Sequence, residues 1–148
     1  MPTAAKAVAA LAFALVAYFA AQGVKAPGVM PEGTQFGLFS EITAAIGFLC
    51  GWIVMGGLVG RGYGEAAASG LRVSVTILFW ALLGFAIYDM VLLSTKLRYD
   101  GPMEAVLDVF NIMMVNGRRI LTVEILGILA VGGVLAGCAA EWAGKRWK

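Results

Sequence analysis

The sequence predicts an all-α integral membrane protein with four transmembrane helices in an up-down bundle and one interfacial amphipathic helix between spans 3 and 4. Two observations predict this class. Of the 148 residues, 61% are hydrophobic and only 14% are charged, which is unlike an ordinary soluble domain. Four runs also reach the roughly 20 mostly apolar residues that a helix needs to cross a bilayer core of about 30 Å. We therefore expect a single membrane domain over residues 1–148.

The expected spans contain few charged side chains. The first holds only Lys6, and the second holds none. The third carries Arg72 at its start and Asp89 near its end, and the fourth carries Glu124 one turn from its start. The four spans are residues 4–24, 42–60, 71–93 and 120–140.

The first span has a competing interpretation as a secretory signal peptide. The stretch "KAVAALAFALVAYFAAQ" has a basic start, an apolar middle and small residues before Gln22, which is the general pattern of such peptides. Its apolar run is longer than a usual signal core. We therefore expect a retained span.

The distribution of Lys and Arg beside the spans predicts that both termini lie in the cytoplasm. With the N-terminus inside, the cytoplasmic side receives six basic residues in short segments: Lys6, Arg61, Arg72, Lys145, Arg146 and Lys148. The opposite side receives five, spread over two longer connections: Lys25, Lys96, Arg98, Arg118 and Arg119. The difference is small, and it favours the cytoplasmic placement.

The sequence predicts no catalytic, metal or cofactor site. It contains no histidine and only two cysteines, Cys50 and Cys138, which removes most hydrolytic triads and imidazole-based metal sites. In parallel spans the two sulfurs would differ in depth by roughly 15 Å at 1.5 Å per residue, whereas a disulfide allows only about 7 Å between Cα atoms. We expect free thiols and a non-enzymatic protein.

Small residues predict where helices approach one another closely. Glycines four residues apart share a helix face and admit a neighbouring backbone. Packing within the bundle is the favoured interpretation, although a homo-oligomer seam or a docking face for another membrane protein would use the same chemistry. The glycine pairs are Gly47 with Gly51, Gly56 with Gly60, and Gly133 with Gly137.

The connections show turn and cap signals. Residues 25–37 contain three glycines and two prolines, which is loop composition. Ser40 is a natural N-cap for the second helix, and Glu41 suits the positive end of its dipole. Residues 61–70 read as a short cytoplasmic hairpin, because "GRGYG" has neither the spacing nor the preceding strand of a phosphate-binding loop.

A charged stretch between spans 3 and 4 predicts the interfacial helix, over residues 102–116. Asp100 is expected to cap it, Pro102 suits its first turn, and "NGRR" at residues 116–119 is expected to end it. The charged side chains then act mainly as caps and a solvated face, and a catalytic carboxylate cluster is the less favoured alternative. The apolar face recurs at helical spacing: Met103, Val106, Leu107, Phe110, Met113 and Met114.

Two carboxylates are expected near one membrane face, Asp89 and Glu124. An acid at that depth is costly unless it is paired or reaches the interface. We expect an ion pair that joins the third span to the fourth, with Arg98, Arg118 or Arg119 as counter-charge. An ion-binding or proton-handling role is the alternative.

The sequence resembles the TrgA family of small inner-membrane proteins from the Rhodobacter and Roseobacter group. The most distinctive shared words are "PEGTQFG" and "RYDGPMEA", and the likeness extends to "FWALLGFAIYDM" and to the ending "VGGVLAGCAAEWAGKRWK". The resemblance implies a bacterial inner-membrane location and an association with tellurite resistance. It implies no catalytic residue.

Two functional classes follow. The first is the role the resemblance implies, in tellurite resistance or envelope homeostasis. The second is an accessory subunit of a larger photosynthetic or respiratory membrane complex, which acts by helix packing; an enzyme acting on lipid or quinone is a weaker third idea. The expected partners are the lipid bilayer and another membrane protein or a second copy, with no nucleic acid. Tryptophans near the span ends motivate the second class: Trp52, Trp80, Trp142 and Trp147.

Overall fold

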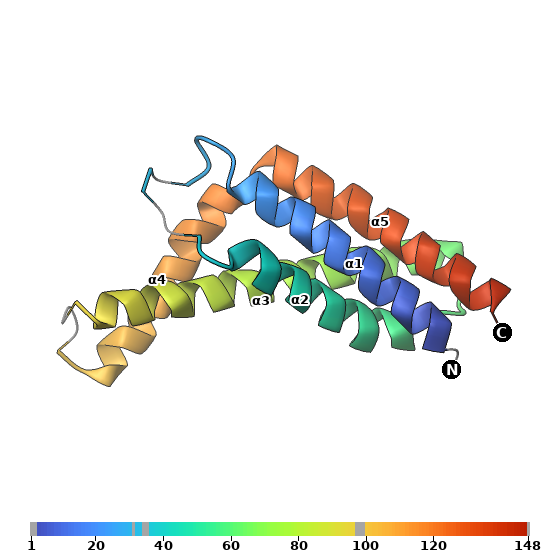
Figure 1. The fold of residues 1–148 in the computed structure, drawn as a ribbon, viewed down its shortest axis with the longest axis horizontal. Helices are drawn as coiled ribbons and strands as arrows, with labels where there is room; N and C mark the ends of the chain where they lie inside the picture. Colours follow the sequence, from blue (N-terminus) through green and yellow to red (C-terminus); the bar gives the residue numbers. More distant parts are fainter. Residues whose placement is uncertain (1–2, 31, 34–35, 97–99, 148) are drawn as a thin grey trace.

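The structure is a computed structural model that describes residues 3–30, 32–33, 36–96 and 100–147 (Figure 1). The all-α class is confirmed over these residues. Four of the segments are long and apolar enough to cross a membrane: α1, α2 together with η1, α3 and α5. The elements are α1 (Thr3–Val24), α2 (Phe39–Ile53), the 3₁₀ turn η1 (Met55–Gly57), α3 (Tyr63–Ser94), α4 (Pro102–Ile120) and α5 (Val123–Arg146).

The helix boundaries differ from the expected spans. Helix α3 has 32 residues, because it begins at Tyr63 and includes the alanine-rich stretch that was expected to be a hairpin. Helix α5 starts later than expected, at Val123, and continues to Arg146. Apolar composition marks where a helix enters the hydrocarbon region, whereas backbone hydrogen bonding continues into polar turns.

The predicted caps of α2 and α4 are not the caps that form. Leu38 is the N-cap of α2, and Ser40 lies inside the helix, buried, with no partner for its hydroxyl among the described residues. Gly101 is the N-cap of α4; the carboxylate of Glu104 instead reaches back and accepts the N–H of Asp100 at 3.0 Å. This backward bond resembles one half of a capping box, but it reaches the residue before the N-cap.

Helix α4 also does not stop at Asn116 as predicted. It continues through Gly117 to Ile120, and Gly117 is buried. A glycine ends a helix when it turns to positive φ. Gly117 has no such positive φ and lies inside the helix, where a Cβ would make only an ordinary contact of 3.8 Å with the side chain of Leu82.

Four helices lie side by side, and α4 runs across their long direction at the end opposite the two chain termini (Figure 1). Helix α1 packs against α2 and α5, while α3 packs against α5 and α4; α2 and α3 touch less extensively. The main buried core is formed mostly by α1, α3 and α5, with Cys50 of α2 and Met55 of η1, and it includes the fully enclosed Phe13 and Ile77.

Glycines bring α2 onto α1. A Cβ at Gly51 would lie 2.6 Å from the carbonyl oxygen of Ala9 and 2.9 Å from the Cα of Ala10. Gly47 faces Phe13 in the same way, one turn along. Side chains cannot occupy such positions, so the two backbones touch directly.

The contact between α3 and α5 is built in the same way. A Cβ at Gly133 would lie 2.9 Å from the carbonyl oxygen of Gly70, and Gly137 faces the backbone of Ala66. Ser74 of α3 also donates a hydrogen bond of 2.9 Å to the carbonyl oxygen of Leu129 in α5. A short polar contact therefore accompanies the close approach of the two backbones.

The third predicted glycine pair does not share a helix face. Helix α2 ends at Ile53, so Gly56 lies in η1 against the side chain of Lys6. Gly60 lies in the following turn with φ of +101°. The spacing of four residues has helical meaning only where the helix continues, and here the chain is already turning.

We expect Gly51→Ala to lower the free energy of unfolding by about 1–3 kcal/mol, because the new methyl group must push α1 and α2 apart. Gly127→Ala in α5 is the matched control: a Cβ there meets no atom within 4 Å, and alanine is the better helix former. Thermal unfolding in detergent, followed by circular dichroism, measures both. Equal midpoints for the two variants would show that this backbone contact does not determine stability.

Candidate functional site

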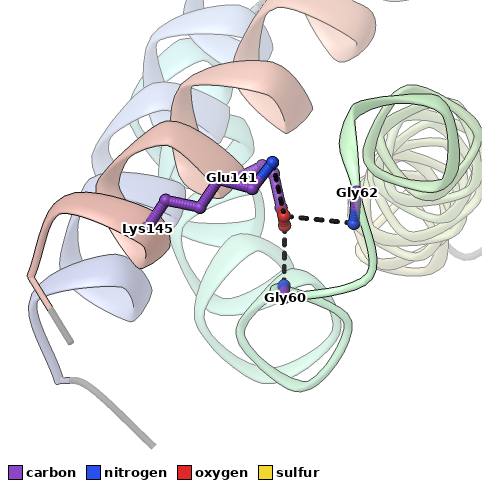
Figure 2. A network of polar contacts seen from close by, with 4 residues as sticks. All are labelled: Gly60, Gly62, Glu141 and Lys145. Atoms are coloured by element: carbon purple, nitrogen blue, oxygen red, sulfur yellow. Dashed lines mark hydrogen bonds and ion pairs between the residues drawn. The ribbon is translucent and has the colours of Figure 1, made fainter.

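The most enclosed polar group in the described chain is the carboxylate of Glu141, near the end of α5 (Figure 2). Its side chain is 0% exposed. One carboxylate oxygen, Oε2, accepts the N–H of Gly60 at 2.6 Å, and the other, Oε1, accepts the N–H of Gly62 at 3.1 Å. The connection between η1 and α3 is therefore tied to α5 by charge-assisted hydrogen bonds.

Two glycines allow the backbone turn that presents these N–H groups to Glu141. Gly60 and Gly62 have φ of +101° and +107°, a region that residues with a side chain adopt only with strain. Their two N–H groups converge on one carboxylate, as backbone donors do in an anion-binding nest. Gly144 also lacks a side chain where a Cβ would meet Val59, so the end of α5 can approach the turn.

Lys145 completes the charge balance of this anchor. Its Nζ lies 3.7 Å from Oε1 of Glu141 and 4.0 Å from the ring centroid of Tyr63 in α3. Because the lysine side chain is 48% exposed, this ion pair is a weaker contribution than the two backbone bonds. The anchor joins three segments near the chain termini, and its carboxylate has no exposed surface for a ligand.

Glu141 was not among the site residues predicted from the sequence. Two signals could have pointed to it. One is a glutamate among alanines and glycines at the end of an apolar span, "GCAAEWAG"; the other is the G-x-G of residues 60–62, which supplies free backbone donors. Neither signal predicts that these two segments meet, because they are about eighty residues apart in the chain.

A second polar contact joins α3 to α4 at the opposite end. The half-buried carboxylate of Asp89 is hydrogen-bonded to the side chain of Asn116. Asn116 is only 7% exposed, so the amide would be costly without this partner. From the sequence, Asn116 was expected only as part of a helix stop, and its pairing with Asp89 was not predicted.

The other members of the expected ion pair lie elsewhere. Glu124, Arg118 and Arg119 are exposed, and Arg98 lies outside the described residues. Within the part of the chain that the structure describes, no ion pair joins Asp89 or Glu124 to Arg118 or Arg119. Arg118 lies on the far side of α4 from Asn116, and Arg119 lies one turn from Asn116 but is exposed.

Helix α4 has three sectors, which lie roughly 100° apart or more on a helical wheel. The sector toward α3 is buried and contains Val109, Asn116 and Ile120. A polar sector contains exposed Glu104, Asn111, Arg118 and Arg119. The remaining sector is apolar and exposed: Met103 70%, Val106 50%, Leu107 63%, Phe110 59% and Met114 65%. Met113 of the predicted apolar face is instead partly buried.

The described residues contain no group of three or more Cys, Asp or Glu side chains that could hold a metal ion. Cys50 is buried and Cys138 partly buried, and both are free thiols. Comparison with protein-family models, with curated proteins and with solved structures finds no match to this chain. The residues themselves therefore carry the functional argument.

We expect Glu141→Gln to lower the free energy of unfolding by about 2–3 kcal/mol, because an amide offers one acceptor oxygen and no charge to two buried N–H donors. Glu65→Gln, an exposed acid in the first turn of α3, is the control and should change it by less than about 0.5 kcal/mol. Thermal unfolding in detergent measures both. A Glu141→Gln variant as stable as the control would contradict the anchoring role.

We expect Asn116→Ala to destabilise the protein by about 1–2 kcal/mol, because it leaves a half-buried carboxylate without its partner. Asp89→Asn should cost less, since an amide can still bond to Asn116, and Glu124→Gln should be neutral because Glu124 is exposed. Abundance in the membrane measures all three. If the Asp89→Asn variant kept normal abundance but no longer supported the tellurite tolerance that the resemblance implies, Asp89 would be an ion or proton site.

Proposed function

We propose that this chain is a non-enzymatic, four-span protein of the bacterial inner membrane that acts in tellurite resistance or related envelope homeostasis. One observation carries the membrane assignment. Helices long enough to cross a bilayer expose large apolar side chains outward, as a lipid-facing surface requires. These side chains include Leu11, Leu15 and Phe19 of α1, Leu49 and Ile53 of α2, Val75 and Phe79 of α3, and Val131 and Leu135 of α5.

The charge distribution supports an up-down arrangement with both termini in the cytoplasm. The end that holds the termini carries Glu65 and the enclosed Glu141 against four cations, which are Lys6, Arg61, Lys145 and Arg146. The connections at the other end are balanced, with five acids and five bases. Their acids are Glu32, Glu41, Asp100, Glu104 and Asp108, and their bases are Lys25, Lys96, Arg98, Arg118 and Arg119. Because cytoplasmic segments carry the excess of Lys and Arg, the end with the termini is the one expected in the cytoplasm.

Helix α4 fits an interfacial position in this orientation. It runs across the long direction of the spans (Figure 1). Its three sectors would then contact the bundle, the hydrocarbon boundary and water. The apolar sector is the one that the sequence predicted for a membrane surface, with Met103 and Phe110 among its most exposed members.

The buried carboxylate supports a structural rather than a catalytic protein. Glu141 is committed to two backbone donors and a lysine, and it has no exposed surface. Asp89 is likewise bonded to Asn116. Catalytic acids need access to a substrate, and these two acids serve helix contacts instead. The link to tellurite rests on the resemblance of "PEGTQFG" and "RYDGPMEA".

An accessory subunit of a larger membrane complex is the second candidate, and the exposure of α3 favours it. Only 17% of the residues in the apolar stretch of α3 are buried, compared with 33–39% in the corresponding stretches of the other three spans. Its outward face includes Val75, Trp80, Tyr88 and Val91. A span so little covered by its own chain could contact a partner helix as well as lipid.

Single cysteines test the topology, in a chain with Cys50→Ala and Cys138→Ala. A membrane-impermeant maleimide added outside intact spheroplasts should label Glu32→Cys and Lys96→Cys. It should label Arg61→Cys and Glu65→Cys only after the membrane is opened. All four positions are exposed, so labelling reports the side of the membrane. The reverse pattern would overturn the orientation and the placement of α4.

Deletion of the coding sequence in the source strain tests the proposed role. We expect lower tellurite tolerance, restored by the wild-type chain and by Glu124→Gln, which alters an exposed position. Glu141→Gln should restore it only in part, since the protein would be less abundant. Unchanged tolerance in the deletion strain, with a photosynthetic or respiratory complex co-purifying in mild detergent, would favour the accessory-subunit candidate.

A further inference from the structure

A groove follows the seam between α2 and α3. Two neighbouring cavities of about 320 Å³ and 380 Å³ make it up, and both are lined by Ile46. The first extends from Phe36 before α2 to Tyr88 on α3, and the second extends to Ile53 and Trp80. Over the fifteen residues of α2, this seam is about 22 Å long at 1.5 Å per residue.

The groove is open toward the side of the bundle. Ile42, Ile53 and Trp80 line it and are 55%, 70% and 51% exposed. Every side chain that lines it is uncharged, and the surface is almost wholly apolar. Water would find few partners there. In a bilayer, hydrocarbon is the natural filling.

A positive charge lies beside the first cavity. The ammonium of Lys25 is 6.0 Å from the ring centroid of Phe36, and Phe36 lines that cavity. A phosphate above an apolar groove would meet a cation there, and a basic residue near the membrane surface favours anionic lipids. Glu41 in the first turn of α2 opposes this preference.

We propose that the groove between α2 and α3 binds one acyl chain of an anionic phospholipid, with its phosphate beside Lys25. The proposal rests on the membrane insertion proposed above and adds a ligand site to it. A helix of another copy is about 10–12 Å wide, so α2 and α3 would have to move apart to admit it. A single acyl chain is much narrower than a helix and can lie in the groove without that movement. In the proposed orientation, the lipid comes from the extracytoplasmic leaflet.

Gly84 allows the groove to be filled without disturbing the protein. It lines the first cavity, and a Cβ there meets no atom within 4 Å. Gly127 on α5 has the same freedom, lies outside both cavities and is the matched control. A leucine at either position adds equal volume to a lipid-facing span, and only Gly84→Leu occupies the groove.

The experiment places a benzophenone amino acid at Ile42, in the groove, or at Val131, on the open face of α5, in the full chain in a bacterial membrane. After illumination, mass spectrometry of the purified chain identifies its adducts. We expect a phospholipid adduct at Ile42, and we expect its yield to fall about tenfold with Gly84→Leu. The reason is that the lipid acyl chain loses its contacts with the groove wall. Gly127→Leu should leave the yield unchanged.

Nanodiscs of mixed phosphatidylglycerol and phosphatidylcholine test the head group. Lys25→Gln should reduce the preference for phosphatidylglycerol at Ile42 about fivefold, and Glu41→Gln should increase it. Two results would show that the probe at Ile42 reacts with bulk lipid and would overturn the proposal. One is an adduct yield at Ile42 that Gly84→Leu does not change; the other is the same ratio of the two lipids in the adducts at Ile42 and at Val131. A cross-linked dimer at Ile42 would assign the groove to a second copy. Absence of lipid adducts at both probes would instead contradict membrane insertion.

Discussion

Direct contact between helix backbones determines how this small bundle is arranged. In a bilayer the hydrophobic effect does not drive helices together, so close packing and short polar contacts must hold them. The chain provides that packing where Gly47 and Gly51 of α2 contact α1, and where Gly133 and Gly137 of α5 contact α3. Each contact excludes even one methyl group. The resulting arrangement is a series of contacts in which α2 packs on α1, α1 on α5 and α5 on α3.

Polar anchors at the two ends of the bundle hold two of the connections between helices in place. At the end with the termini, Glu141 holds the turn that links η1 to α3. At the other end, Asp89 bonds to Asn116 and holds α4 on α3. A buried polar group is favourable only when its partner is in place, so each anchor discriminates against alternative placements of its connection.

The sequence predicted the helical class and the apolar segments well, because composition and length report directly on a bilayer. It also predicted glycines that prove to lie at helix contacts, such as Gly47, but it could not say which helix each would meet. Gly60 shows the limit: spacing alone suggested a helix face, whereas the residue turns with positive φ to present its N–H to Glu141. The partners of Glu141 could not be read from composition, because the donors of Gly60 and Gly62 belong to the backbone. The partner of Asp89 is a side chain, but its approach depends on how α4 packs on α3, which the sequence does not state.

The unequal packing of the four spans accounts for the groove. Helix α2 directs its glycines at α1, and α3 directs its small residues at α5. Neither has a comparable small-residue face for the other, so bulky side chains such as Phe39 and Phe85 meet at the seam, with ring centroids 5.1 Å apart. Rings packed edge to face hold two helices at a distance that side chains do not fill. The glycines therefore close the contacts of α2 with α1 and of α3 with α5, and they leave the seam between α2 and α3 open as the groove proposed to bind lipid.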